Sequence, residues 1–205
     1  MAKLYFRYGV MGAGKSTALL QVVESYQRQS RGAKNVCILK HISDAKNPDV
    51  VSRLGISHPV DVHVNDEVDL YGLVEKMISE NPELRCVVVD EVQFMAPQHI
   101  DQLFRVAVLL DIPVICYGLR TDFSTEMFPA SARLFSLAHN MEKLKTICAS
   151  DQCTSGKEAM FNARRELSSG QWVSSGPQLA PDTGAEYEYL ALCPPCYLMN
   201  VKSLA

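Results

Sequence analysis

The fold is decided by a stretch close to the amino terminus, Gly9-Val10-Met11-Gly12-Ala13-Gly14-Lys15-Ser16. It matches the pattern G-x-x-x-x-G-K-S/T at every fixed position and lies between an apolar run and an expected helix. Backbone N–H groups of such a loop point at phosphate oxygens, and the helix adds its positive end. Lys15 can place a cation on the β- and γ-phosphates, and the Ser16 hydroxyl can bind Mg²⁺. The sequence therefore predicts a P-loop nucleotide site; a glycine-rich turn with a chance Lys-Ser pair is the alternative.

Strand-like and helix-like patterns alternate through residues 1–147. Short apolar runs predict buried strands, and apolar residues spaced three and four apart predict amphipathic helices. We expect strands at residues 4–8, 36–39, 85–90, 112–117 and 144–148, and helices at 16–29, 69–80, from 97 onward and at 131–139. Residues 44–69 have weak periodicity and are expected to form a long loop. The alternation predicts an α/β fold of the P-loop NTPase type, a mostly parallel sheet with helices on both faces.

Composition and charge narrow the class of protein. The 205 residues are 47% hydrophobic and 21% charged, which is ordinary for a globular protein with a sizeable core. The net charge of −3 lacks the basic excess of proteins that coat nucleic acid or membrane surfaces. No apolar run approaches the roughly 20 residues that span a bilayer, and the amino terminus lacks a signal-peptide pattern. We therefore expect a cytoplasmic protein with no nucleic-acid or membrane partner.

Two adjacent carboxylates, Asp90 and Glu91, follow a continuous apolar run that is typical of a buried strand. A P-loop protein needs an acidic residue at the end of a neighbouring strand, so Asp90 is the candidate for a water-mediated magnesium contact. Glu91 stands where a second carboxylate can accept a proton from an attacking hydroxyl or water. The alternative is a strand end capped by two solvated acids. The chain lacks the N-K-x-D element of small GTPases, and its length suits a small kinase.

The seven cysteines are an odd number, which argues against a fully paired disulfide framework. Three lie in short apolar runs, where cysteine usually acts as a small hydrophobe: Cys37, Cys86 and Cys116. The others form two pairs in the last third of the chain: Cys148, Cys153, Cys193 and Cys196. Two pairs of thiolates suit a closed tetrahedral Zn²⁺ site. Such a site would hold together a small domain, residues 148–205, where helical periodicity is lost. Ordinary reduced thiols and a redox C-x-x-C pair are the alternatives.

The order of these blocks resembles that of type II thymidine kinases, most closely the bacterial branch. Nearly the whole chain takes part: the P-loop, D-E-V-Q-F at residues 90–94, C-Y-G-L-R-T-D-F at residues 116–123, and the two cysteine pairs. The two middle blocks are much more specific than the P-loop. The resemblance implies transfer of the γ-phosphate of ATP to the 5′-hydroxyl of thymidine, or also of deoxyuridine, with Mg²⁺ and a structural Zn²⁺. It also implies a homotetramer and feedback inhibition by dTTP.

The resemblance carries roles onto single residues of this chain. Glu91 matches the catalytic base, and Gln93 belongs to the same nucleotide-contacting block. Apolar positions that enclose the deoxynucleoside in the family are matched by Met11, Phe94, Leu119, Phe123 and Phe128. Tyr189 matches a tyrosine on a lasso-like loop that covers the base, near residues 183–187. Asp44 and Arg53 match polar positions near the active site. Without the resemblance, the apolar residues would be interpreted as core packing.

The sequence departs from the family pattern in places, and other functions stay open. The first cysteine pair is more widely spaced than usual, which makes Asp151 an alternative ligand. Lys46 stands where the family often has arginine, and the covering loop has fewer glycines. Arg53 and Arg120 are both candidates to add positive charge during phosphoryl transfer. A P-loop ATPase that binds nucleic acid or protein, with Glu91 activating water, is a second hypothesis, and a nucleotide-sensing regulator without turnover is a third.

Overall fold

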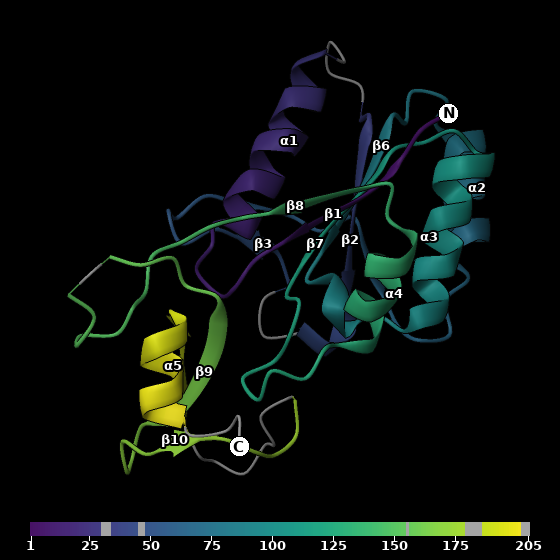
Figure 1. The fold of residues 1–205 in the computed structure, drawn as a ribbon. Coiled ribbons are helices and arrows are strands. Elements are labelled where there is room, and N and C mark those ends of the chain that lie inside the picture. The colour runs from purple at the N-terminus through teal and green to yellow at the C-terminus, as the bar shows by residue number, and fades with distance from the viewer. Residues whose placement is uncertain (30–33, 45–47, 155, 179–185, 202–205) are drawn as a thin grey trace.

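A computed structural model of the chain describes residues 1–29, 34–44, 48–154, 156–178 and 186–201 (Figure 1). Lys46 and residues 183–185 of the expected covering loop lie outside the described residues. The main sheet has six parallel strands in the order β5-β2-β6-β7-β1-β8. Their bounds are β1 Leu4–Tyr8, β2 Val36–His41, β5 Val62–Val64, β6 Cys86–Asp90, β7 Val114–Gly118 and β8 Asn140–Lys143. The predicted α/β fold with a mostly parallel sheet is confirmed.

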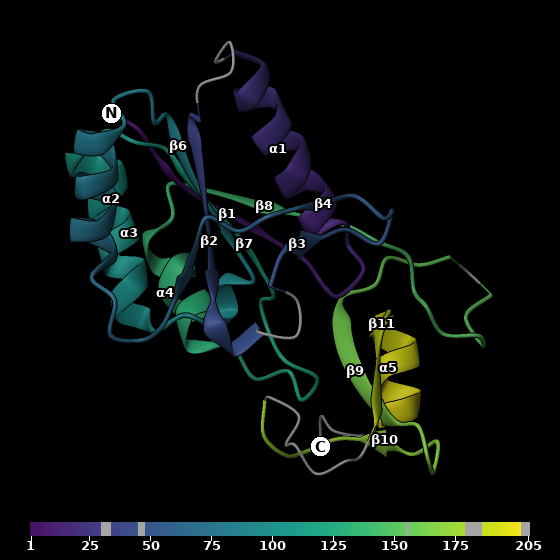
Figure 2. The ribbon, with the colours of Figure 1, turned by 180° about the vertical axis from the view of Figure 1, so that it is seen from behind.

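Helices cover both faces of this sheet (Figures 1 and 2). One face carries α1, and the other carries a layer of three helices. Their bounds are α1 Lys15–Gln29, α2 Leu70–Glu80, α3 Pro97–Leu109 and α4 Pro129–Leu137. The last of these begins two residues earlier than the pattern predicts, because Pro129 occupies the first turn, where its fixed φ favours a helix and its missing N–H is not needed.

The apolar run of β6 is explained by burial on both faces of the sheet. Side chains of a strand alternate between the two faces. Val87 and Val89 pack in the core below α2, α3 and α4, while Cys86 and Val88 pack in the core below α1. All five residues of β6 are buried, so Asp90 reaches the carboxyl end of the sheet inside the protein.

The sixth strand is not where the apolar pattern predicts it. Residues 144–148 form no strand, and in this stretch only Ile147 makes an isolated bridge, to Glu158. The edge strand is β8, Asn140–Lys143, which is held by its backbone: the Leu144 N–H donates to the carbonyl of Tyr8 at 2.7 Å. Its first three residues are exposed. An edge strand with solvent-facing side chains carries no apolar signal, which is why the prediction was wrong.

Residues 44–69 contain more structure than the predicted loop. The segment is preceded by the 3₁₀ turn η1 (Ile42–Asp44), pairs β3 (Val50–Val51) with β4 (Ser57–His58), and ends in β5 at the sheet edge. Strands of two or three residues are too short to show a period. The turn of the hairpin carries Arg53, and this places a cation over the carboxyl end of the sheet.

The carboxyl-terminal part of the chain forms a second, antiparallel sheet. Its order is β10-β9-β11, and its elements are β9 Phe161–Glu166, β10 Trp172–Val173, β11 Tyr187–Leu192 and α5 Pro194–Val201. The helix was not predicted, since eight residues that begin with two prolines show little periodicity. A small core, which includes Cys193, Cys196 and Tyr197, joins the helix to the sheet. Beside it, Val10 and Ala13 of the P-loop pack against Ala159 and Ala191.

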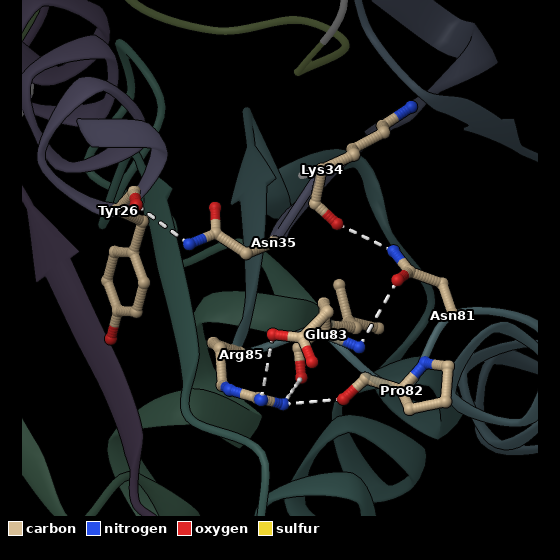
Figure 3. Close-up of polar contacts among 8 residues, drawn as sticks. Tyr26, Lys34, Asn35, Asn81, Pro82, Glu83 and Arg85 are labelled. Atoms are coloured by element: carbon tan, nitrogen blue, oxygen red, sulfur yellow. Dashed lines mark hydrogen bonds and ion pairs between the residues drawn. The ribbon is translucent and has the colours of Figure 1, made fainter. Parts of the chain in front are cut away.

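Polar groups cluster around the amino-terminal ends of β2 and β6 (Figure 3). Because the strands are parallel, this is the end of the sheet away from the P-loop. Nδ2 of Asn35 donates to the carbonyl of Tyr26 at 2.7 Å and so ties β2 to the end of α1. Nδ2 of Asn81 donates to the carbonyl of Lys34 at 2.6 Å. These contacts stabilise the main sheet at the amino-terminal ends of its strands, away from the P-loop.

Candidate active site

The P-loop lies at the carboxyl end of β1 and wraps into α1. Gly12 and Gly14 both have φ of 75°, the left-handed region that side chains disfavour. The first N–H groups of α1, which follows the loop, have no partner within the helix and can face an anion. In parallel α/β sheets, ligands bind outside the carboxyl ends of the strands, and the loop lies at that edge.

Two cations line the cavity above this loop. The cavity has a volume of about 750 Å³ and is lined by residues 11–16 of the loop together with Arg53 and Glu91. Gly9 and Val10 are not among the residues that line it. Nζ of Lys15 donates to the carbonyl of Val10 at 3.2 Å, so the side chain folds back over the loop. The guanidinium of Arg53 lies against the loop at Gly12, since a methyl group added at Gly12 would lie 3.1 Å from Nη1 of Arg53. Burial lowers the pKa of Lys15, and the nearby carboxylates of Glu91 and Asp90 oppose this shift.

Asp90 is a buried carboxylate with an unused oxygen. Its exposed fraction is 2%, and among the described residues its Oδ1 has no hydrogen-bond partner. Nζ of Lys40 lies 3.8 Å from the other oxygen, Oδ2, and 2.8 Å from a carboxylate oxygen of Asp44. Burial raises the pKa of Asp90 to about 7; the charge of Glu91 adds to the shift and that of Lys40 opposes it. A second cavity of about 230 Å³ is lined by Asp90, Asp44 and Ser16. This donor set of carboxylate and hydroxyl oxygens fits Mg²⁺.

Glu91 is held in a strained position by Gln93. Its φ is 46°, in the left-handed region, which costs a non-glycine residue about 1–3 kcal/mol and is found at functional sites. Nε2 of Gln93 donates to a carboxylate oxygen of Glu91 at 2.5 Å, and its Oε1 accepts the N–H of Leu119 at 2.9 Å. Gly118 leaves room for this amide: a methyl group there would lie 2.6 Å from Oε1. The buried Gln93 thus fixes Glu91 relative to the end of β7.

The six predicted substrate-side residues line one cavity. It has a volume of about 190 Å³, and those residues are Met11, Phe94, Leu119, Phe123, Phe128 and Tyr189. The rings of Phe94 and Phe128 meet edge to face, with centroids 6.3 Å apart. Met11, Phe94 and Leu119 also line the larger cavity above the P-loop, so the two cavities share a wall. An apolar cavity beside a phosphate site suits a flat, weakly polar ring attached to a reacting group.

The same cavity is lined by three residues that the sequence analysis did not single out. Oδ1 of Asp122 accepts the N–H groups of Ser124 and Glu126, so this carboxylate shapes the loop. Gln178 reaches the cavity from the segment after β10. Asn162 reaches it from β9. Asp122 belongs to the block at residues 116–123, whereas no local motif marks Asn162 or Gln178, which meet the cavity only through the tertiary fold.

Arg120 lies away from the phosphate cavity. It lines a separate, very small cavity of about 10 Å³ together with Tyr8, Lys143 and the first two residues of the P-loop. Among the described residues, the lining of the large cavity includes Arg53 and not Arg120. Of the two arginines predicted as candidates, the geometry therefore favours Arg53.

The four paired cysteines converge on one point. The sulfur atoms of Cys148, Cys153, Cys193 and Cys196 all lie within 4.8 Å of one another. Sγ of Cys153 lies 3.9 Å from Sγ of Cys193, too far for a disulfide. Zn–S bonds of about 2.3 Å at tetrahedral angles place two sulfurs about 3.8 Å apart, so the cluster fits Zn²⁺. In the described part of the chain, the cluster does not include Asp151.

Comparison with known proteins places the chain in a family. The family model described as thymidine kinase matches residues 2–197. Thymidine kinase of Rhizobium etli is 40% identical over 94% of this chain and 92% of that protein. Thymidine kinase of Chromobacterium violaceum is 39% identical over 96% of this chain and 98% of that protein. Thymidine kinase of Pasteurella multocida is 40% identical over 94% and 95% of the two chains.

The comparison with solved structures adds little to the family assignment. A crystal structure of Pif1 helicase from Candida albicans is similar with a TM-score of 0.41 and 17% identity, over 70% of this chain and 36% of the helicase. That similarity is too low to bear on function. Within the described residues, no helix has the length and apolar character needed to cross a membrane.

The match over residues 2–197, with about 40% identity to relatives along nearly their full length, shows that the chain belongs to the thymidine kinase family.

Proposed function

We propose that the protein transfers the γ-phosphoryl group of ATP to the 5′-hydroxyl of thymidine. The observation that carries this proposal is the wall shared by two cavities, one above the P-loop and one lined by aromatic side chains. Glu91 lines the first cavity together with the shared residues Phe94 and Leu119. An acceptor in the aromatic cavity would therefore have its reacting group near both Glu91 and the terminal phosphate. Membership of the thymidine kinase family supports thymidine as that acceptor.

The phosphates of ATP would lie on the P-loop, against the first backbone N–H groups of α1. Lys15 and Arg53 would neutralise the charge of the β- and γ-phosphates. Ser16 and Asp90 would hold Mg²⁺, the latter through water, and this use of Asp90 is supported by its unused buried oxygen. The ion, when bound, offsets charge on the phosphate oxygens. Phosphoryl transfer is accelerated mainly by such positioning and charge neutralisation.

The acceptor hydroxyl would be activated by Glu91. A carboxylate within about 2.6–3.2 Å of the 5′-oxygen can take its proton as the bond to phosphorus forms. The amide of Gln93 holds one oxygen of that carboxylate and leaves the other for the hydroxyl. The base of the nucleoside would lie among the apolar residues of the smaller cavity, beside Tyr189 and Phe128.

The four cysteines would hold a structural Zn²⁺. Four thiolates leave no open position on the ion, so we assign it no step in the reaction. The ion would stabilise residues 148–205 as a small domain against the nucleotide-binding domain, residues 1–147. The change from a parallel to an antiparallel sheet supports this division. The resemblance to the family extends the proposal to a cytoplasmic homotetramer inhibited by dTTP.

The proposal is tested by offering acceptors one at a time. The protein is incubated with Mg²⁺-ATP and each deoxynucleoside in turn, and the monophosphates are separated and measured, with and without added nucleic acid. The proposal predicts dTMP, with deoxyuridine as the next best acceptor and no effect of nucleic acid. ATP hydrolysis stimulated by DNA or RNA, with no monophosphate formed, would support the ATPase hypothesis instead. ATP binding without turnover would support a nucleotide sensor.

A further inference from the structure

Asn162 connects the P-loop to the wall of the nucleoside cavity. It lies in β9 of the small antiparallel sheet, and its exposed fraction is 3%. Its Oδ1 accepts the backbone N–H of Met11 at 2.8 Å, and its Nδ2 donates to the carbonyl of Thr121 at 3.0 Å. Met11 belongs to the P-loop, whereas Thr121 stands between Leu119 and Asp122, which line the nucleoside cavity.

The two contacts require both ends of an amide. The backbone N–H of Met11 needs an acceptor, and the carbonyl of Thr121 needs a donor. Aspartate at position 162 would supply no donor, and an apolar side chain would supply neither group. Both backbone groups would then be left without a side-chain partner in the interior. The Asn162 amide is therefore oriented with its oxygen toward the N–H of Met11 and its nitrogen toward the carbonyl of Thr121.

Neighbouring side chains hold the same wall but do not contact the P-loop in this way. Arg164 follows Asn162 on the same face of β9, and its guanidinium lies 3.7 Å from the ring centroid of Phe123. The hydroxyl of Tyr197 donates to the carbonyl of Phe123 at 2.7 Å. The wall at residues 121–123 is thus fixed to the small sheet, and Asn162 fixes it to the P-loop as well.

We propose that Asn162 is a positioning residue that sets the nucleoside cavity at the right distance from the phosphates. This inference rests on the proposed kinase function. ATP bound on the P-loop and a nucleoside in the cavity lie on two different segments, and transfer requires their reacting atoms to be about 3–3.5 Å apart. One side chain that bonds both segments limits their relative movement. Without it, the acceptor hydroxyl is misplaced and water can compete for the phosphoryl group.

The test compares two variants that each remove a buried asparagine amide. Asn162→Leu removes both contacts and keeps the branched shape of the side chain, although its two methyl groups are larger than the amide. We expect kcat for dTMP formation to fall about 10- to 100-fold, since a misplacement of 1 Å can reduce the rate about 100-fold. We also expect ATP hydrolysed per dTMP formed to rise several-fold. A merely structural loss of stability would lower the amount of active enzyme without changing that ratio.

Asn35→Leu is the matched control. Asn35 is also buried and also donates to a backbone carbonyl, that of Tyr26 (Figure 3). It directly precedes β2, at the amino-terminal end of the parallel sheet, away from the P-loop. We expect this variant to lower the melting temperature while the ratio of hydrolysis to transfer stays that of the parent. If Asn162→Leu does not fold, Asn162→Ser takes its place, because a hydroxyl still donates and accepts but reaches less far. It should shift the ratio in the same direction by a smaller amount.

The inference and the proposed function fail in different ways. If the parent protein forms no dTMP, the proposed function is wrong. If the parent forms dTMP and the Asn162 variants keep its kcat and its ratio of hydrolysis to transfer, the positioning role is wrong. The positioning role is also wrong if the Asn162 variants lose kcat only in proportion to the fraction of folded protein, as is expected for Asn35→Leu. A higher ratio at position 162 alone supports the positioning role.

Discussion

Gly118→Ala tests how the catalytic carboxylate of Glu91 is positioned, without changing Glu91 itself. A Cβ atom at Gly118 would lie 2.6 Å from Oε1 of Gln93 and 2.8 Å from Cγ1 of Val92. Both distances are shorter than van der Waals contact, so an atom must move. Val92 is buried in the core, and the amide of Gln93 is the group that can rotate away.

The size of the effect follows from the two hydrogen bonds of that amide. The bond to the Glu91 carboxylate is charge-assisted and contributes about 1.5–3 kcal/mol, and the neutral bond from Leu119 contributes about 0.5–1.5 kcal/mol. Their combined loss amounts to about 2–4.5 kcal/mol. If it acts on the transition state, kcat/KM for thymidine falls about 30- to 2,000-fold, at about 1.36 kcal/mol for each factor of ten. ATP binding should persist, because Lys15 and the loop amides are unchanged.

The assay is steady-state dTMP formation, together with ATP binding by calorimetry and a thermal melt. Gly72→Ala is the control, because its added methyl group would also lie 2.6 Å from a side-chain oxygen, that of Asp69. Asp69 is exposed and can swing into solvent, so activity should not change and helix α2 should gain stability. An unchanged kcat/KM in Gly118→Ala would refute the claim that Gln93 positions Glu91.

Three further predictions follow from the site. Glu91→Gln should lower kcat about 10²- to 10⁴-fold while ATP binding survives, the usual effect of losing a general base; turnover near that of the parent would remove Glu91 from the mechanism. Removal of Zn²⁺ by a strong chelator should expose residues 148–201 to proteolysis before the main sheet unfolds, because metal binding and folding are coupled; an unchanged digestion pattern would contradict a structural metal. Tyr197→Phe removes a hydrogen bond to Phe123 of about 1 kcal/mol, so KM for thymidine should rise about fivefold with KM for ATP unchanged; equal changes in both KM values would indicate a general structural effect.

Much of the fold and part of the site could be predicted from the sequence because local patterns specify them. The P-loop is a contiguous motif whose glycines determine the backbone conformation, and β6 is an apolar run buried on both faces. The paired cysteines predicted a cluster, and the fold brings their sulfur atoms together. The roles of the individual site residues remain predictions that the variants above test.

What the sequence did not predict depends on contacts between distant segments. Asn162 meets Met11 only because β9 packs beside the P-loop, and no spacing in the chain marks that contact. The edge strand β8 is held by backbone hydrogen bonds, and its exposed, mostly polar side chains gave no strand signal. The hairpin that carries Arg53 over Gly12 has strands too short to show alternation.

The central claim concerns the geometry of three groups: Glu91, the acceptor hydroxyl and the terminal phosphate. It is tested most directly by a crystal structure with thymidine and a non-hydrolysable ATP analogue bound together. We predict the 5′-oxygen within about 2.6–3.2 Å of a Glu91 carboxylate oxygen, in line with the γ-phosphate, and the pyrimidine between Phe128 and Tyr189. A pyrimidine bound elsewhere, or a Glu91 side chain turned away from the acceptor oxygen, would contradict the account.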